Sequence, residues 1–336
     1  MTSCISYSEI RINQQTKWSS SYLLCFSIHR SLFYSISVTG SGGALFSTKS
    51  GVSLQITNSA FSSCCSSGKG GGIFMENSDD ISISTSCSFR CLATDRGQFF
   101  SIEARNSATF YIGTSSITKS SPNYDGDLHT MRVFGGTQYC DYVNSTNNYI
   151  KEYGTGICFM GSVGNTISYI TLYNNKGDLT LELSNTGTAV AQYCNLVSNS
   201  NNGNYRNYLV SGLKMNLDFN YCCFYQNSFP KLFGAASITR SATLSNCRYD
   251  DTNGITTFST YSCIYSSTLT KFSINHEPIE YCLQYWTTTP KMTPKITATP
   301  KRTATFKPTQ STEPSLVFSR PTSPILLLIP FFFFLI

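Results

Sequence analysis

Acidic side chains are the first candidates for chemistry in this chain, because polysaccharide cleavage commonly needs two carboxylates that face one cleft. Asp79-Asp80 and Asp250-Asp251 are the only adjacent acid pairs, and roughly 170 residues separate them. A third group consists of Asp125, Asp127 and His129. Because Asp and Gly are typical turn residues, the segment around this group favours a loop. We therefore predict a non-catalytic protein, with a polysaccharide-active lyase or hydrolase that uses this third group as the alternative.

The sequence predicts neither a metal site nor a cofactor. The three histidines, His29, His129 and His276, have no spacing typical of metal ligands. The 14 cysteines lack the C-x2-C pairs that indicate a zinc site or a redox motif.

Aromatic residues beside amides indicate a different function, the binding of a carbohydrate or protein ligand. Tyr205, Tyr208, Tyr221 and Tyr225 lie near an Asn-rich stretch. Exposed tyrosines next to amide groups are typical of carbohydrate or protein binding, so these four residues are the predicted binding site. Core packing of some of them is the alternative.

Composition and charge limit the class of partner. The chain has 336 residues, of which 40% are hydrophobic, 14% aromatic and only 12% charged. Of the net charge of +6, the segment after residue 286 carries +5, which leaves +1 for the rest. Residues 1–286 thus lack the excess of basic residues typical of a nucleic-acid-binding surface, and no nucleic-acid partner is expected.

The elements that must position these residues are indicated by a repeat of 23 to 35 residues. Its mark is an apolar or aromatic residue, often with Cys two residues earlier and Asn three residues later. The marks are Phe26, Phe61, Phe89, Ile117, Tyr142, Leu172, Leu196, Phe224, Tyr249 and Phe272. A period of this length predicts a solenoid.

Alternation within the repeat indicates strands. Val52, Leu54 and Ile56 are apolar at every second position, as are Ile81 and Ile83, and no stretch keeps a helical period. Short strands in units of about 26 residues predict an all-β fold, a right-handed parallel β-helix of about nine coils. Gly42-Gly43 would supply backbone freedom at a corner.

Stacking of the coils predicts interior ladders. We expect Phe61, Phe89, Leu172, Leu196, Phe224 and Phe272 to form one, and Cys87, Cys140, Cys194, Cys222 and Cys247 another, pointing the same way. Asn175, Asn199, Asn227 and Asn275 would lie at a turn, where their inward amides bond neighbouring coils. The cysteines are expected either to be core residues or to form disulfides between neighbouring coils.

Two motifs resemble a known family. Gly42-Gly43-Ala44-Leu45 matches a GGA-plus-aliphatic motif, and Phe224-Tyr-Gln-Asn227 and Phe272-Ser-Ile-Asn275 match an FxxN motif. Both are similar to the polymorphic outer-membrane-protein-like repeats of bacterial and protist surface proteins, over residues 26–275. The resemblance implies a pectin-lyase-like β-helix at a cell surface, often linked to adhesion, and it carries over no active-site residue.

The predicted domain organisation has four parts. Residues 1–25 form a cap or a truncated coil, residues 26–286 the β-helix, residues 287–323 a disordered Thr/Pro/Lys-rich stalk, and residues 324–336 an apolar segment. The apolar segment is either a membrane-spanning helix or a removable lipid-anchor signal.

These features predict an extracellular domain attached to the plasma membrane through its C-terminus. The first residues do not read as a signal peptide, because Glu9 and Arg11 interrupt them, so we expect a longer N-terminus. Asn144 is in the single N-glycosylation sequon, which is compatible with export. Expected partners are the membrane and a glycan or protein ligand, and the sequence leaves the oligomeric state open.

Overall fold

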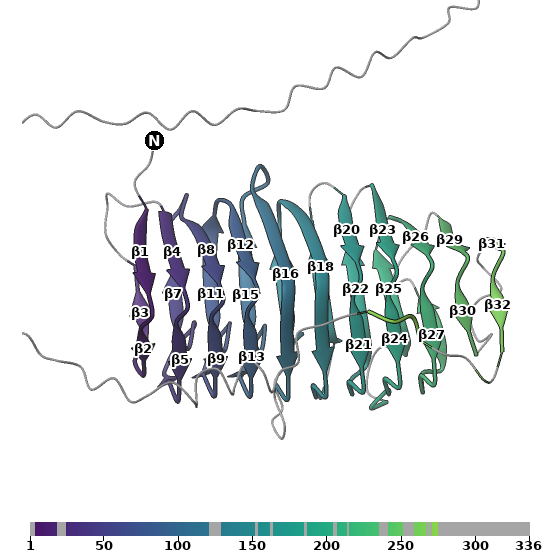
Figure 1. Cartoon of the computed structure of the whole chain (residues 1–336), viewed down its shortest axis with the longest axis horizontal. Helices are drawn as coiled ribbons and strands as arrows, with labels where there is room; N and C mark the ends of the chain where they lie inside the picture. Colours follow the sequence, from purple (N-terminus) through teal and green to yellow (C-terminus); the bar gives the residue numbers. More distant parts are fainter. Residues whose placement is uncertain are drawn as a thin grey trace, which may run out of the picture. The chain divides into compact units, whose positions relative to one another are not determined.

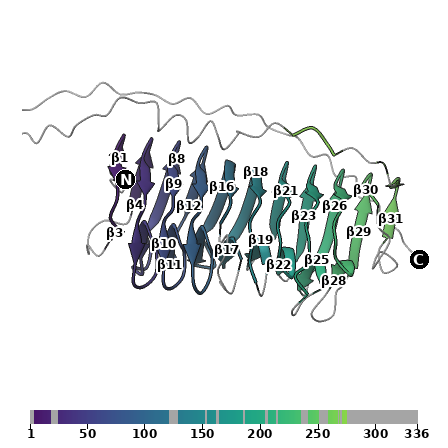
Figure 2. The same ribbon diagram turned by 90° about the horizontal axis from the view of Figure 1, so that it is seen from below.

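Every strand pair that the computed structural model describes is parallel, and each strand pairs with its counterpart about one repeat away in the sequence. The structure describes residues 4–18, 25–120, 129–151, 154–161, 164–184, 187–203, 207–213, 215–234, 241–250, 259–266, 268 and 271–274. All regular elements among these residues are strands. The described part of the chain contains no helix long and apolar enough to cross a membrane. The predicted all-β parallel β-helix is therefore confirmed (Figures 1 and 2).

The coils have three faces, and three of the described coils add a strand to a short extra sheet. Face 1 contains the longer strands, which pair in chain order: β1 (Ile5–Ser8), β4 (Cys25–His29), β8 (Ser53–Thr57), β12 (Ile81–Ser84), the first half of β16 (Thr109–Thr118), the first half of β18 (Thr137–Thr146), β20 (Asn165–Ser168), β23 (Thr188–Gln192), β26 (Asn216–Asn220), β29 (Ser241–Ser245) and β31 (Ser259–Tyr261).

Face 2 follows face 1 in each coil after a sharp corner. Its strands are β2 (Arg11–Ile12), β5 (Leu32–Tyr34), β9 (Ala60–Ser62), β13 (Cys87–Phe89), the second halves of β16 and β18, β21 (Thr171–Tyr173), β24 (Asn195–Val197), β27 (Cys223–Tyr225), β30 (Arg248–Tyr249) and β32 (Ile264–Tyr265). The extra sheet contains β6 (Ser37–Val38), β10 (Cys65–Ser66) and β14 (Leu92–Ala93).

Face 3 closes the coil. It contains β3 (Thr16–Lys17), β7 (Leu45–Ser47), β11 (Ile73–Ser78), β15 (Phe100–Ala104), β17 (Met131–Phe134), β19 (Gly154–Met160), β22 (Leu179–Ser184), β25 (Tyr208–Leu213) and β28 (Lys231–Gly234). The turn that leads into this face needs a left-handed backbone, with φ of 68° at Gly42, 67° at Gly70 and 69° at Gly97. Glycine adopts this conformation without a steric penalty, which explains the GGA motif.

The core consists of apolar ladders because strands in register bring equivalent side chains together at the spacing of neighbouring strands. Ile28, Ile56, Ile83 and Ile112 are paired one above the other on face 1 and are all buried. Face 2 and face 3 contribute similar rows to the same core.

Two corners per coil use a left-handed residue that is usually not glycine. At corner 1, between faces 1 and 2, this residue is Glu9 in the first described coil and Ser262 in the last, and its φ lies between 44° and 56° in all of these coils. At corner 2, after face 2, it lies between 51° and 55° from Ser35 to Gln226. The next residue points inward, and where it is Ser, Cys or Asn, its side chain bonds backbone groups of its own coil and of the neighbouring coil.

Asparagine fills the inward position of corner 2 in the second half of the solenoid. The Asn175 amide donates to the Ser145 carbonyl over 2.9 Å, and its own N–H donates to Oδ1 of Asn199 over 3.0 Å. Asn199 repeats these contacts with the Leu172 carbonyl and with Oδ1 of Asn227. Asn148, which the repeat did not mark, begins the row. Asn275 lies outside the described residues.

Two residues assigned to the aromatic and aliphatic ladder lie elsewhere. Phe89 is paired with Ser62 and is only half-buried, because the inward position of its strand is taken by Ser88. Phe272 is outside the coil strands and packs against Arg248, with 4.6 Å from the guanidinium carbon to the ring centre. These two ladder assignments are wrong.

The cysteines do not form one ladder. Cys194, Cys222 and Cys247 occupy consecutive coils at corner 1, whereas Cys140 is in the apolar row of face 1 between Ile112 and Ile167. Cys87 pairs with Ala60 on face 2 and is disulfide-bonded. The predicted single row of five cysteines is therefore wrong. The residue two positions before the mark of the repeat does not fall at the same place in every coil.

Both proposed states of the cysteines occur. Cys4 and Cys25 form a disulfide between neighbouring coils, whereas the corner-1 cysteines are free and buried. Burial raises the pKa of the Cys140 and Cys222 thiols, so these side chains stay protonated and behave as small apolar residues.

Substitution of Asn199 tests the corner-2 row. Asn199→Ala is expected to lower the free energy of unfolding by about 3 kcal/mol, because the Leu172 carbonyl and the Asn175 N–H lose buried partners. Urea denaturation measures the change. Asn220→Ala, a substitution on the outer side of face 1, is the control and should change the value by less than about 0.5 kcal/mol. Equal effects of the two substitutions would show that the row does not stabilise the fold.

Candidate functional site

Four tyrosines stack along corner 1 and form a continuous ridge on the surface. Tyr142, Tyr169, Tyr193 and Tyr221 come from four consecutive coils, with ring centres 4.6, 4.9 and 5.0 Å apart and planes within 8° of parallel. The two end rings are 38% and 42% exposed. We call these four residues the tyrosine ridge.

The backbone at corner 1 does not require tyrosine. The four residues have φ between 51° and 53°, and the same left-handed position is occupied by Asn58, Thr85, Thr114 and Asn246 in other coils. Asparagine is the common non-glycine choice for this conformation, and large side chains are uncommon there. The aromatic run is therefore a property of the surface and not of the turn.

Stacking determines which part of each ring is available. The faces of the two central rings, Tyr169 and Tyr193, are covered, because each of these two rings has a parallel partner on both sides. The ridge therefore presents ring edges and phenol oxygens in a row with the period of the strands. Beside it, the last outward residues of face 1 are Asp141 and, in the next three coils, the uncharged Ser168, Gln192 and Asn220.

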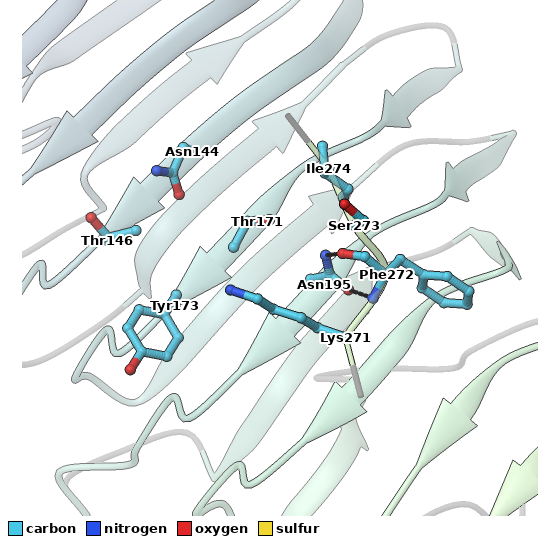
Figure 3. A pocket seen from close by; sticks show the side chains of 9 residues that line it. All are labelled: Asn144, Thr146, Thr171, Tyr173, Asn195, Lys271, Phe272, Ser273 and Ile274. Carbon is cyan, nitrogen blue, oxygen red and sulfur yellow. Dashed lines mark hydrogen bonds between the residues drawn. The ribbon is translucent and has the colours of Figure 1, made fainter. Parts of the chain in front are cut away.

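A small cavity lies on the adjoining face 2, under the segment Lys271–Ile274, which we call the strap. The cavity has a volume of about 240 Å³ (Figure 3). Its lining comprises the strap and Asn144, Thr146, Thr171, Tyr173 and Asn195. Asn144, Thr171 and Asn195 occupy one outward row in three consecutive coils.

Asn195 holds the strap through main-chain contacts. Its Nδ2 donates to the Phe272 carbonyl over 2.9 Å, and its Oδ1 accepts the Phe272 N–H over 3.0 Å (Figure 3). A side-chain amide that makes both bonds imitates the edge of a strand, so it recognises extended backbone whatever side chain is present. Arg248 over the Phe272 ring and Lys271 over the Tyr173 ring add two further contacts.

Comparison with known proteins adds nothing to this geometry: no family model, curated protein or solved structure matches the chain.

The tyrosines predicted from the sequence are not brought together. Tyr221 is in the ridge, Tyr225 is half-buried on the outer side of face 2, and Tyr208 is on face 3, where Lys231 lies 5.9 Å from its ring centre. Tyr205 lies outside the described residues. The predicted cluster is therefore wrong as a single site, because residues close in the sequence belong to different faces of one coil.

The ridge was missed although the sequence contains a signal for it. Tyr193-Cys194 and Tyr221-Cys222 are tyrosine-cysteine pairs that occupy equivalent positions in consecutive coils. Tyr142 is one of the marks of the repeat, and it is exposed. The reason is that a left-handed residue turns its side chain outward and shifts the alternation of the following strand by one residue.

The candidate acids and the sequon have different environments. Asp125 and Asp127 lie outside the described residues, whereas His129 is buried and its Nε2 lies 2.8 Å from Oε2 of Glu182. His129 is therefore not on an open loop. Asn144 is half-buried in face 2 and lines the cavity under the strap.

Release of the strap can be tested with Asn195→Ala. We expect amide hydrogen exchange at Phe272 to become at least about 10-fold faster, because each lost hydrogen bond contributes about 1 kcal/mol and two are removed. Asn144→Ala is the matched control, since Asn144 has the same row position two coils earlier. Unchanged exchange in Asn195→Ala would mean that other contacts hold the strap.

Proposed function

We propose that this chain is a non-catalytic binding protein of the cell surface, and that it contacts its partner through the tyrosine ridge. The observation that supports this proposal is the run of four stacked tyrosines at positions where the backbone favours other residues. Tyrosine is enriched at binding sites because it offers a large contact area, a hydroxyl group and few rotatable bonds.

The ridge is preorganised for binding. Each ring stacks on one or two neighbours above a rigid stack of paired strands, so little side-chain freedom remains to be lost when a partner binds. Three of the four residues beside it are uncharged, with Asp141 as the exception, which favours a partner with mainly polar, neutral groups. We therefore expect binding that depends little on salt concentration, unlike binding driven by charge.

A protein partner suits the ridge better than a sugar. Sugar rings stack on open aromatic faces, whereas the central faces of the ridge are covered by its own rings. Ring edges and phenol oxygens can instead contact apolar side chains and hydrogen-bond main-chain groups of a protein. We favour adhesion to a protein surface, with a glycan as the alternative ligand.

The proposed attachment to the membrane rests on the sequence. Residues 287–323 would act as the extended stalk and residues 324–336 as the spanning segment or lipid-anchor signal. All of these residues lie outside the described part of the chain. The resemblance to polymorphic outer-membrane-protein-like repeats supports the same location, with the ectodomain extracellular.

Adhesion of beads coated with the purified chain tests the binding proposal. The double variant Tyr169→Ser, Tyr193→Ser should reduce bead attachment to cultured epithelial cells at least about 10-fold, because interface tyrosines commonly contribute more than 1 kcal/mol each. Tyr34→Ser, Tyr139→Ser is the control, since these tyrosines are at least as exposed, at 38% and 41%, but lie outside the ridge. A glycan array run in parallel identifies a sugar ligand.

Equal loss of attachment in both double variants would contradict the role of the ridge, provided that circular dichroism shows both to be folded. A sugar bound by the unchanged chain and lost in the ridge variant would keep the ridge and replace the protein partner.

Protease shaving tests the location separately. If the chain is displayed outside the cell, brief trypsin treatment of intact producing cells should remove the β-helix, because the stalk contains Lys291, Lys295 and Arg302 as cleavage sites. Quantitative immunoblotting against residues 26–286 measures the loss, with a cytoplasmic protein as the control for lysis. Full retention of the signal would place the chain elsewhere.

A further inference from the structure

A second group of chemically active side chains is enclosed on face 3. His129, Cys158 and Glu182 come from three consecutive coils, and one ligand atom from each lies within 4.8 Å of the others. The Glu182 Oε2 atom is 2.8 Å from Nε2 of His129 and 3.7 Å from Sγ of Cys158. All three residues are buried, with at most 3% exposed.

The coil register makes this group. Cys158 on β19 and Glu182 on β22 are direct partners in neighbouring strands. Their side chains are on the side of the sheet opposite to Ile157 and Phe159, which belong to the core. Histidine reaches them from the turn before β17, where it takes the left-handed position that Gly42, Gly70 and Gly97 have in preceding coils.

The intervening coil leaves room for the imidazole. A Cβ atom at Gly154 would lie 2.6 Å from Cδ2 and 3.0 Å from Nε2 of His129, so any side chain there would displace the ring. The ring can therefore pass over Gly154 and reach a carboxylate two coils away. Glycine at this place and histidine at the turn are two separate sequence choices that both serve the contact with Glu182.

From this arrangement we infer that His129, Cys158 and Glu182 bind a zinc ion. Imidazole nitrogen, thiolate sulfur and carboxylate oxygen are all zinc ligands, whereas magnesium and calcium prefer oxygen alone. A tetrahedral zinc ion separates its nitrogen and oxygen ligands by about 3.4 Å and its sulfur and oxygen ligands by about 3.6 Å, given its usual bond lengths. The observed 3.7 Å already matches the second value, and the 2.8 Å contact must open by roughly 0.6 Å.

Charge supports the same conclusion. A carboxylate and a thiolate together balance the two positive charges of the ion, so the filled site is neutral in a place where unbalanced charge is costly. The strand partner of Cys158 in the preceding coil is the cation Arg132. Its guanidinium lies 3.7 Å from the Glu103 carboxylate on the coil before.

Zinc binding to the full chain tests this inference. After treatment with a chelator and addition of zinc, the chain should retain one zinc ion per molecule, measured by mass spectrometry of the metal. Cobalt(II) added instead should give the ultraviolet thiolate charge-transfer band and the visible bands of a tetrahedral site. Cys158→Ser and Glu182→Gln should each weaken binding by at least about 100-fold, more than the 10–100-fold that loss of an outer partner costs.

Matched variants separate this site from other thiols. Cys91→Ser removes a free buried cysteine at corner 2 and should leave the zinc affinity and the cobalt bands unchanged. Gly154→Ala should weaken binding without removing a ligand. Cys158→Ser keeps the contact between His129 and Glu182, so we expect this variant to fold. Circular dichroism checks that it does.

Two results would overturn the inference: the absence of tight zinc binding by the unchanged chain, or equal zinc binding by folded Cys158→Ser. The tyrosine ridge is not part of this site, so the outcome is independent of the proposed adhesion.

Discussion

Hydrogen bonding between coils at the left-handed corners is the constraint on which the rest of the structure depends. At corner 1 the N–H of Tyr169 donates to the Gln192 carbonyl over 3.0 Å, and that of Tyr193 donates to the Asn220 carbonyl over 2.9 Å. The backbone N–H at each of these corners is thus paired with a carbonyl of the next coil. Leaving such a group buried and unpaired would be costly. Because every coil must turn at the same place, the register of all three faces is set, and side chains repeat at the strand spacing.

Register converts distance along the chain into contact. Residues 24 to 29 positions apart, such as His129, Cys158 and Glu182, become neighbours on face 3, while tyrosines at similar intervals become a ridge. Both features need only one residue per coil. A solenoid can therefore change its surface chemistry by single substitutions at one coil position and leave the ladders that hold the coils together unchanged.

The sequence was sufficient for the fold class, because the period and the alternation of apolar residues both act locally. It was also sufficient for the idea of an asparagine row, since an inward amide near a turn has few alternatives to bonding neighbouring coils. It failed where alternation is interrupted: the left-handed residue before each short strand shifts the inward position, so Phe89 was placed inside and Tyr142 was not recognised as exposed. The cluster around Glu182 has no local spacing and becomes visible only with the register.

The energetics of the tyrosine ridge indicate that it serves something other than folding. A stacked aromatic pair contributes about 0.5–1.5 kcal/mol beyond its buried area. A residue with a side chain in the left-handed conformation costs about 1–2 kcal/mol, which asparagine partly recovers through local hydrogen bonds. Tyrosine and asparagine both bear this cost, and the stacking that tyrosine gains is similar in size to the roughly 0.5–1.5 kcal/mol of a hydrogen bond that asparagine can gain, so stability alone gives little preference for Tyr169 and Tyr193 over the Asn used in other coils. The proposed contact with a partner would account for four successive tyrosines at such positions, since the partner would meet a rigid surface that is already ordered.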